Sequence, residues 1–140
     1  MFNTTLLTTL LIDGASRVGE FIPGSADSKV KHRFLEWGNL EFFALPSSDG
    51  IEPVTIYIII TAKWLKNHTH DHGFKKFIVH LLAPHLVFQD TCRLLVILAL
   101  YQGRFQDFDS WQSLMSYKAS QYGSVIRLRS SCRETPVLTN

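Results

Sequence analysis

The run VTIYIIITA at 54–62 constrains the fold of this chain more than any other stretch of its 140 residues. β-Branched and aromatic side chains follow one another there, and such residues favour the extended, pleated backbone of a β-strand. The pattern predicts a strand over 54–65 that is buried on both faces at its centre, because nearly every residue is apolar. A strand of this kind needs neighbouring strands and a covering layer.

Further extended segments lie on both sides of this strand. The residues FLEWGNLEFFAL at 34–45 predict two short aromatic strands joined at the dipeptide Gly-Asn at 38–39, which tolerates turn geometry. Residues 74–87 predict another strand, which Pro84 interrupts. The segment SVIRLR at 124–129 predicts the last strand.

Two helices are predicted between the last two strands. Asp90 and Thr91 are a typical helix start, and Gly103 ends the first helix. The second helix begins within DFDSWQSLMSYKAS, with Asp107 or Asp109 as its cap. The apolar stripes at helical spacing are Leu94, Ile97, Leu98 and Tyr101 in the first helix, and Trp111, Leu114, Met115 and Lys118 in the second.

This order of elements predicts an α+β fold, in which a small mixed or antiparallel sheet is covered by a two-helix hairpin. Leucines and threonines alternate in pairs at 4–11, which predicts a short amphipathic helical arm. The expected organisation is an N-terminal arm and flexible connector over 1–31, a single α+β domain over 32–129 and a disordered tail over 130–140.

Charge and cysteine content limit the possible functions. The net charge is only +2, and the C-terminal arginines, Arg127, Arg129 and Arg133, are too few to predict direct nucleic-acid binding. We expect them to be a solvated strand edge. Cys92 is expected to be a small buried apolar residue, and Cys132 lies in the polar tail. The two cysteines form neither a CxxC pair nor a framework of disulfides, which indicates a reducing compartment. No apolar run approaches the roughly 20 residues of a membrane helix, so a soluble protein is expected.

The segment NHTHDHGF at 67–74 is a weak candidate for a metal site. His68, His70 and His72 alternate, so in an extended segment their imidazoles would project from one side, as zinc binding requires. The segment resembles the HxHxDH motif of the metallo-β-lactamase superfamily, but one residue is missing between the second histidine and the aspartate. A polar hairpin turn is the favoured interpretation, and no metal or cofactor is expected.

Over residues 34–128 the aromatic and apolar positions follow a characteristic order. An aromatic block and an apolar strand precede an Asn-His pair, a glycine and an aromatic strand; a Phe-led helix, a glycine and a second amphipathic helix follow. The positions that define this order are Phe34, Trp37, Asn39, Leu40, Phe42, Asn67, His68, Gly73, Phe74, Lys76, Phe77, Phe88, Leu94, Leu98, Leu100, Gly103, Asp109 and Trp111. Their order and spacing resemble those of the replication enhancer protein of plant geminiviruses, a small single-domain viral protein.

The resemblance implies a non-enzymatic accessory factor without a cofactor. Proteins of that family self-associate, bind the viral replication initiator, the host sliding clamp and the retinoblastoma-related regulator, and raise viral DNA synthesis in the host nucleus. Because interface energy concentrates at aromatic anchors, the candidate partner-binding residues are Phe34, Trp37, Phe42, Phe43 and Trp111, with ordinary core packing as the alternative for each. Neither sequence-specific nucleic-acid contact nor a membrane span is expected.

Two other functions stay open at this point. One is a small viral matrix-like structural protein, which a mixed sheet-and-helix core with an apolar arm would fit, although such proteins usually carry a more basic surface. The other is a zinc-binding protein that uses His68, His70 and His72.

Overall fold

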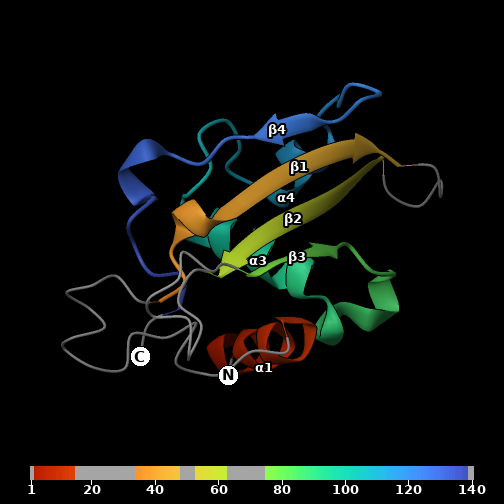
Figure 1. The fold of residues 1–140 in the computed structure, drawn as a ribbon. Helices are drawn as coiled ribbons and strands as arrows, with labels where there is room; N and C mark the ends of the chain where they lie inside the picture. Colours follow the sequence, from red (N-terminus) through yellow and green to blue (C-terminus); the bar gives the residue numbers. More distant parts are fainter. Residues whose placement is uncertain (1, 15–33, 48–52, 63–74, 139–140) are drawn as a thin grey trace.

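The computed structural model of the chain describes residues 2–14, 34–47, 53–62 and 75–138. Its centre is an antiparallel sheet of four strands in the order β3-β2-β1-β4, and helices pack against one face of this sheet (Figure 1). The predicted α+β fold, with a small sheet covered by helices, is confirmed. The elements are α1 (Phe2–Gly14), η2 (Trp37–Asn39), β1 (Leu40–Pro46), β2 (Val54–Ala62), β3 (Lys75–His80), η3 (Pro84–Gln89), α3 (Thr91–Tyr101), α4 (Trp111–Met115), β4 (Ser124–Ile126) and η4 (Ser130–Cys132), where η denotes a 3-10 helix.

Strand β2 lies inside the sheet, between β1 and β3. Its even-numbered residues from Val54 to Ala62 are buried, whereas the odd-numbered ones are only half-buried. The prediction that both faces are buried is therefore wrong. Helices cover one face of the sheet, so alternate residues of β2 face the core and the remaining ones face away from it.

The first of the two predicted aromatic strands is wrong, because Glu36 makes only an isolated bridge to Pro136, and the 3-10 helix η2 precedes β1. Its short turn is held by the backbone N–H of Glu36, which donates to Asn39 Oδ1 at 2.9 Å. The N–H of Gly38 donates to the carbonyl of Arg133 at 2.8 Å, and a Cβ on Gly38 would lie 2.8 Å from that oxygen. The predicted turn at 38–39 is therefore present, and a long-range contact to the C-terminal segment holds its backbone.

Strand β3 is shorter than the sequence predicts. It ends at His80, and the 3-10 helix η3 begins at Pro84. Proline lacks the N–H that a sheet ladder needs, and its fixed φ suits the first position of a helical turn. The predicted strand over 74–87 is therefore wrong from residue 81 onward, and residue 74 lies outside the described part of the chain.

The predicted start and end of α3 are confirmed. Asp90 is its N-cap, with Oδ1 accepting from the N–H of Arg93 at 2.9 Å, and Gly103 follows the helix with a φ of 62°. The predicted apolar stripe is wrong in part, because Ile97 is 38% exposed and Tyr101 is 88% exposed. The helix lies between the sheet and α1, so its first two turns are buried almost all round.

Helix α4 has only five residues. Its N-cap is Ser110, whose hydroxyl accepts from Ser113 N–H at 3.1 Å while the Ser113 hydroxyl accepts from Ser110 N–H at 3.2 Å. The predicted caps, Asp107 or Asp109, are therefore wrong, and Lys118 lies beyond the helix. The reciprocal serine pair satisfies two N–H groups that an aspartate one residue earlier would not reach in this register.

The C-terminal residues belong to the folded domain as far as residue 138. Cys132, Val137 and Leu138 are buried, and the Val137 N–H donates to the carbonyl of Leu35 at 3.0 Å. The predicted disordered tail over 130–140 is therefore wrong for the described residues. Apolar side chains near the end of the chain pack into the same core as those of β1. The prediction of disorder used the polar composition of the segment and its position at the terminus, and neither shows this contact.

Helix α1 packs into the same core rather than standing apart as an arm. Leu6 and Leu10 are fully buried, and the helix contacts α3 and β3. The Thr91 hydroxyl donates to the carboxylate of Asp13, which ties the end of α1 to the start of α3. The connector predicted after it lies outside the described residues. None of the helices in the described part of the chain is both long enough and apolar enough to cross a membrane.

Candidate functional site

The sheet face that the helices leave uncovered is the candidate site. The register of the four strands places alternate residues of each strand on this face. We call it the outer sheet face, and its residues are Glu41, Phe43 and Leu45 of β1, Thr55, Tyr57, Ile59 and Thr61 of β2, Lys76, Ile78 and His80 of β3, and Val125 of β4.

One row of this face crosses all four strands. Phe43 pairs with Tyr57 on one side and with Val125 on the other, and Tyr57 pairs in turn with His80. The rings of Phe43 and Tyr57 are stacked, with centroids 5.0 Å apart and 9° between their planes. Cross-strand aromatic pairs of this kind stabilise a sheet and hold their side chains in one conformation. The centre of the outer sheet face is therefore rigid and apolar.

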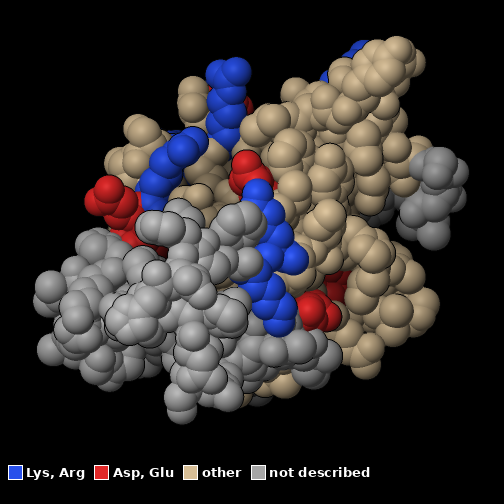
Figure 2. Space-filling model, in the orientation of Figure 1, with Lys and Arg blue, Asp and Glu red and all other residues tan. Residues whose placement is uncertain are grey.

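The rim of the outer sheet face adds exposed aliphatic side chains. Ile78 is 63% exposed and Val125 is 60% exposed, on the two edge strands. The acidic and basic members are Glu41 and Lys76. Figure 2 shows the surface over β1, β2 and β4 with few charged side chains. A contiguous exposed apolar surface with polar residues at its edge is typical of a protein–protein contact.

A smaller set of exposed apolar residues lies on the helical side of the molecule. Phe88 of η3 is 76% exposed, and Ile97 and Tyr101 lie one turn apart on the solvent-facing side of α3. This set has no rigid aromatic pair comparable to that of Phe43 and Tyr57 among the described residues. The outer sheet face is therefore the stronger candidate of the two.

Of the five predicted partner-binding residues, the structure brings one to the candidate site. Phe43 lies on the outer sheet face, whereas Phe34, Trp37 and Phe42 are buried in the core at 6%, 0% and 1% exposure. Phe42 packs edge-on against Phe105, with centroids 5.1 Å apart. Core packing, the alternative interpretation, therefore accounts for these three residues, and no partner reaches them while the domain is folded.

The fifth predicted residue, Trp111, is half-buried at the start of α4. The Arg93 guanidinium lies over its ring, 5.0 Å from the centroid. This cation–π contact joins α4 to α3 on the helical side of the sheet, away from the outer sheet face. A contact within the domain therefore gives this aromatic residue a structural role.

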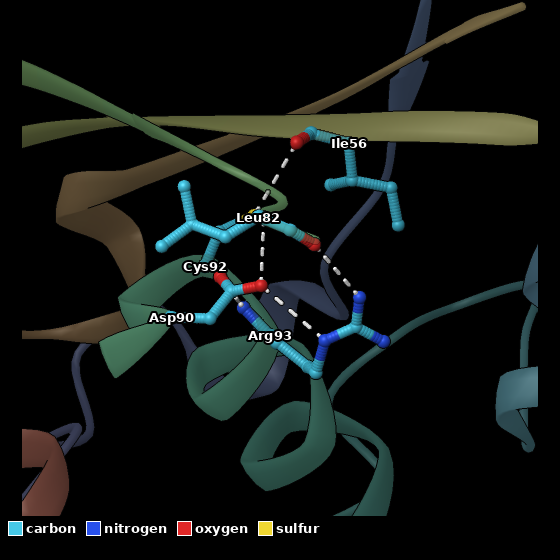
Figure 3. A network of polar contacts seen from close by, with 5 residues as sticks. All are labelled: Ile56, Leu82, Asp90, Cys92 and Arg93. Atoms are coloured by element: carbon cyan, nitrogen blue, oxygen red, sulfur yellow. Dashed lines mark hydrogen bonds and ion pairs between the residues drawn. The ribbon is translucent and has the colours of Figure 1, made fainter. Parts of the chain in front are cut away.

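Arg93 also belongs to a polar network at the start of α3 (Figure 3). The Leu82 N–H donates to Asp90 Oδ2 at 2.8 Å, and the Arg93 guanidinium donates to the same oxygen at 3.3 Å and to the Leu82 carbonyl at 3.2 Å. These bonds connect the segment after β3 to the helix. The role that follows from them is structural, since they satisfy buried groups with one another.

Cys92 is part of the same region and does not have the surroundings of a nucleophile. Its thiol is fully buried and donates to the carbonyl of Ile56 at 3.4 Å. Burial raises the pKa of the Cys92 thiol, the Asp90 carboxylate raises it further, and Arg93 opposes them in part. A reactive cysteine needs the opposite shift, toward the thiolate.

The predicted metal candidates lie outside the part of the chain that the structure describes, since His68, His70 and His72 fall within 63–74. Among the described residues, no group of three or more histidine, cysteine, aspartate or glutamate side chains is placed to hold a metal ion.

Apart from Phe43, the residues of the outer sheet face were not among the predicted candidates, and Tyr57, Ile78 and Val125 are among those missed. The available signal was strand alternation, because a sheet with one covered face must present every second residue of its strands on the other face. At the centre of β2 that signal is hidden, since the consecutive residues Ile58, Ile59 and Ile60 are all apolar.

The chain was compared with protein-family models, with curated proteins and with solved structures, and none of them matches. The outer sheet face is a candidate site on its geometry alone.

Proposed function

We propose that this chain is a non-enzymatic viral accessory factor that enhances viral DNA replication through self-association and through binding to other replication proteins. The observation that supports this function is the outer sheet face, with its stacked Phe43 and Tyr57 and its exposed Ile78 and Val125. An apolar, weakly charged face loses free energy when a second protein surface removes it from water.

Self-association is the first activity in the proposal. Two copies that pack outer sheet face against outer sheet face would form a sheet sandwich around a two-fold axis, with the sheets about 10 Å apart. In such a dimer each contact occurs twice, so a modest patch contributes to the interface from both sides. The stacked pair would lie near the centre of the interface, where anchors contribute most.

The further partners in the proposal come from the resemblance to geminivirus replication enhancers. They are the viral replication initiator, the host sliding clamp and the retinoblastoma-related regulator, and the place of action is the host nucleus. The outer sheet face supplies a surface for one such partner at a time, while the helical side leaves Phe88, Ile97 and Tyr101 exposed for another.

The test of the proposal is the oligomeric state of the whole chain. Sedimentation velocity across the micromolar range should show reversible association, which Ile78→Lys should weaken at least tenfold, equivalent to about 1.4 kcal/mol. The same substitution on the helical side, Ile97→Lys, is the matched control and should leave self-association unchanged. Circular dichroism confirms that both variants fold.

Two results would contradict the proposal. A monomer at every concentration would remove self-association, and equal weakening by both lysine variants would show that the outer sheet face is not the interface. A second measurement addresses the partners, by co-precipitation with a geminivirus replication initiator. One of the two single variants, Ile97→Lys or Ile78→Lys, should retain the initiator, and the other, which changes the surface that binds it, should lose it.

A further inference from the structure

A short antiparallel pairing beyond β4 brings two distant segments together. Phe105 pairs with Leu128 in an isolated bridge. The Arg129 N–H donates to the Arg104 carbonyl at 2.8 Å, and the Gln106 N–H donates to the Arg127 carbonyl at 2.9 Å. These two bonds flank the bridge, so Arg104 lies directly opposite Arg129 although 25 positions separate them.

The side chains of this pairing are sorted between two faces. Phe105 and Leu128 are buried, so they point into the core, and their neighbours point outward. Three of these outward neighbours are arginines, Arg104, Arg127 and Arg129, which we call the arginine cluster. Like charges directly opposite each other destabilise a strand pair, so this arrangement is unfavourable unless an anion lies between them.

The cluster is held in place by the residues around it. Arg104 Nε donates to Gln102 Oε1 at 3.0 Å, and its guanidinium lies 5.9 Å from the centroid of the buried Trp37 ring. Arg129 Nε donates to the Phe105 carbonyl at 3.0 Å. Two of the three guanidinium groups are therefore positioned in advance, which lowers the entropic cost of binding a ligand.

No acidic side chain in the described part of the chain neutralises the cluster. Among the residues that the structure describes, none of the three arginines is paired with a carboxylate. Arg127 and Arg129 are exposed, and Arg104 is half-buried. A fourth arginine, Arg133, is exposed in the segment that follows η4. In Figure 2, basic side chains stand out at the upper left, on the side toward which β4 runs in Figure 1.

The cluster continues the outer sheet face. Val125 lies on that face beside Phe43, and Arg127 and Arg129 follow at every second position along the chain. Guanidinium groups match phosphate oxygens with two parallel hydrogen bonds, and aromatic side chains next to a basic surface suit exposed bases. In a duplex the bases are stacked inside, whereas a single strand can turn them toward such a surface.

We infer that the arginine cluster binds the phosphate groups of a single-stranded nucleic acid, with the bases directed toward the rim of the outer sheet face at Val125. The low net charge of the chain does not indicate this surface, because folding adds Arg104 to Arg127 and Arg129, which are already close in sequence. Binding through three arginines is weak and depends on salt concentration. It does not require self-association, since one copy carries the complete cluster.

The test is fluorescence anisotropy of the full chain with a labelled oligodeoxythymidylate of about 20 nucleotides, titrated at about 50 to 300 mM salt. Three phosphate contacts predict a log–log salt slope of about −2 for a single strand. Arg127→Gln should weaken binding several-fold and reduce the slope by about 0.7, because one contact is lost. Arg127 is chosen because it is exposed, and circular dichroism verifies the fold of the variant.

The matched control is Lys118→Gln, which removes one exposed positive charge away from the cluster and should leave affinity and slope unchanged. A hairpin duplex of similar length should bind more weakly than the single strand. Absence of binding at the lowest salt, equal loss in both variants, or tighter binding of the duplex would each overturn the inference. A further contrary result is Arg127-dependent binding of the chain to vesicles that contain phosphatidylserine, without binding to the oligonucleotide. A membrane surface would then be the ligand.

Discussion

The Asp90 carboxylate and the Arg93 guanidinium form a buried ion pair at the start of α3, with 3.3 Å between Oδ2 and Nε. Asp90 is fully buried, and it also caps the helix and accepts from the Leu82 N–H. The same guanidinium reaches Trp111 of α4. The carboxylate therefore connects the segment after β3 to α3, and its removal leaves several buried donors without an acceptor.

We expect Asp90→Ala to destabilise the protein by about 3 kcal/mol, because the Arg93 charge and two backbone N–H groups would lose their acceptor. Urea unfolding followed by circular dichroism measures the change. Asp109→Ala is the control, since Asp109 is exposed and α4 is capped by Ser110, and it should change stability by less than about 0.5 kcal/mol. Equal effects of the two substitutions would contradict this account of the network.

The Cys92 thiol should make the fold sensitive to alkaline pH. Its pKa is raised in the folded state, so above the unfolded value of about 8.5 the unfolded chain loses a proton that the native state retains. The stabilising contribution is complete below that pH and is lost as pH rises, at about 1.4 kcal/mol per pH unit. Between pH 7 and pH 10, wild type should therefore lose more stability than Cys92→Ala. Parallel pH profiles of the two proteins would refute the prediction.

Gly38 and Gly103 should respond differently to the same substitution. A Cβ at Gly38 would meet the Arg133 carbonyl oxygen at 2.8 Å, and that oxygen is backbone held by a hydrogen bond, so Gly38→Ala should cost about 2 to 3 kcal/mol. At Gly103 the space is open, and the cost of about 1 kcal/mol comes from the φ of 62° alone. Thermal unfolding of both variants measures the difference. A larger loss for Gly103→Ala would contradict the close approach of the two segments.

The C-terminal segment should contribute to stability as core residues do. Val137 is 2% exposed, so Val137→Ala should destabilise the protein by about 2 kcal/mol. Val125→Ala is the matched control on an exposed edge position and should cost about 0.5 kcal/mol or less. Urea unfolding at sub-micromolar protein keeps self-association out of the comparison. If Val137→Ala had no effect, the segment after residue 130 would not belong to the folded domain.

Features that depend on neighbours in sequence were predictable, because their causes are local. The β-branched run of β2 favours an extended backbone wherever it lies, Asp90 caps a helix that begins one residue later, and Gly103 supplies the positive φ that ends it. The α+β class follows from the order of such local elements.

Features that depend on contacts between distant segments were not predictable. The Arg133 carbonyl lies against the backbone of Gly38, and three of the five proposed aromatic anchors are buried because the core forms around them. Alternation along β2 puts Tyr57 on the face opposite Ile56 and Ile58, but it does not say which face the helices cover. The packing of the helices decides that Tyr57 faces outward.

By itself the sequence determined that the β2 segment is extended and where α3 begins and ends, since these choices depend on propensities and caps within a few residues. Only the tertiary structure decided which face of the sheet stays uncovered and that Arg104 lies beside Arg129. The physical reason is that burial and charge proximity are properties of packed surfaces, and the strand register that brings such surfaces together joins positions far apart in the chain.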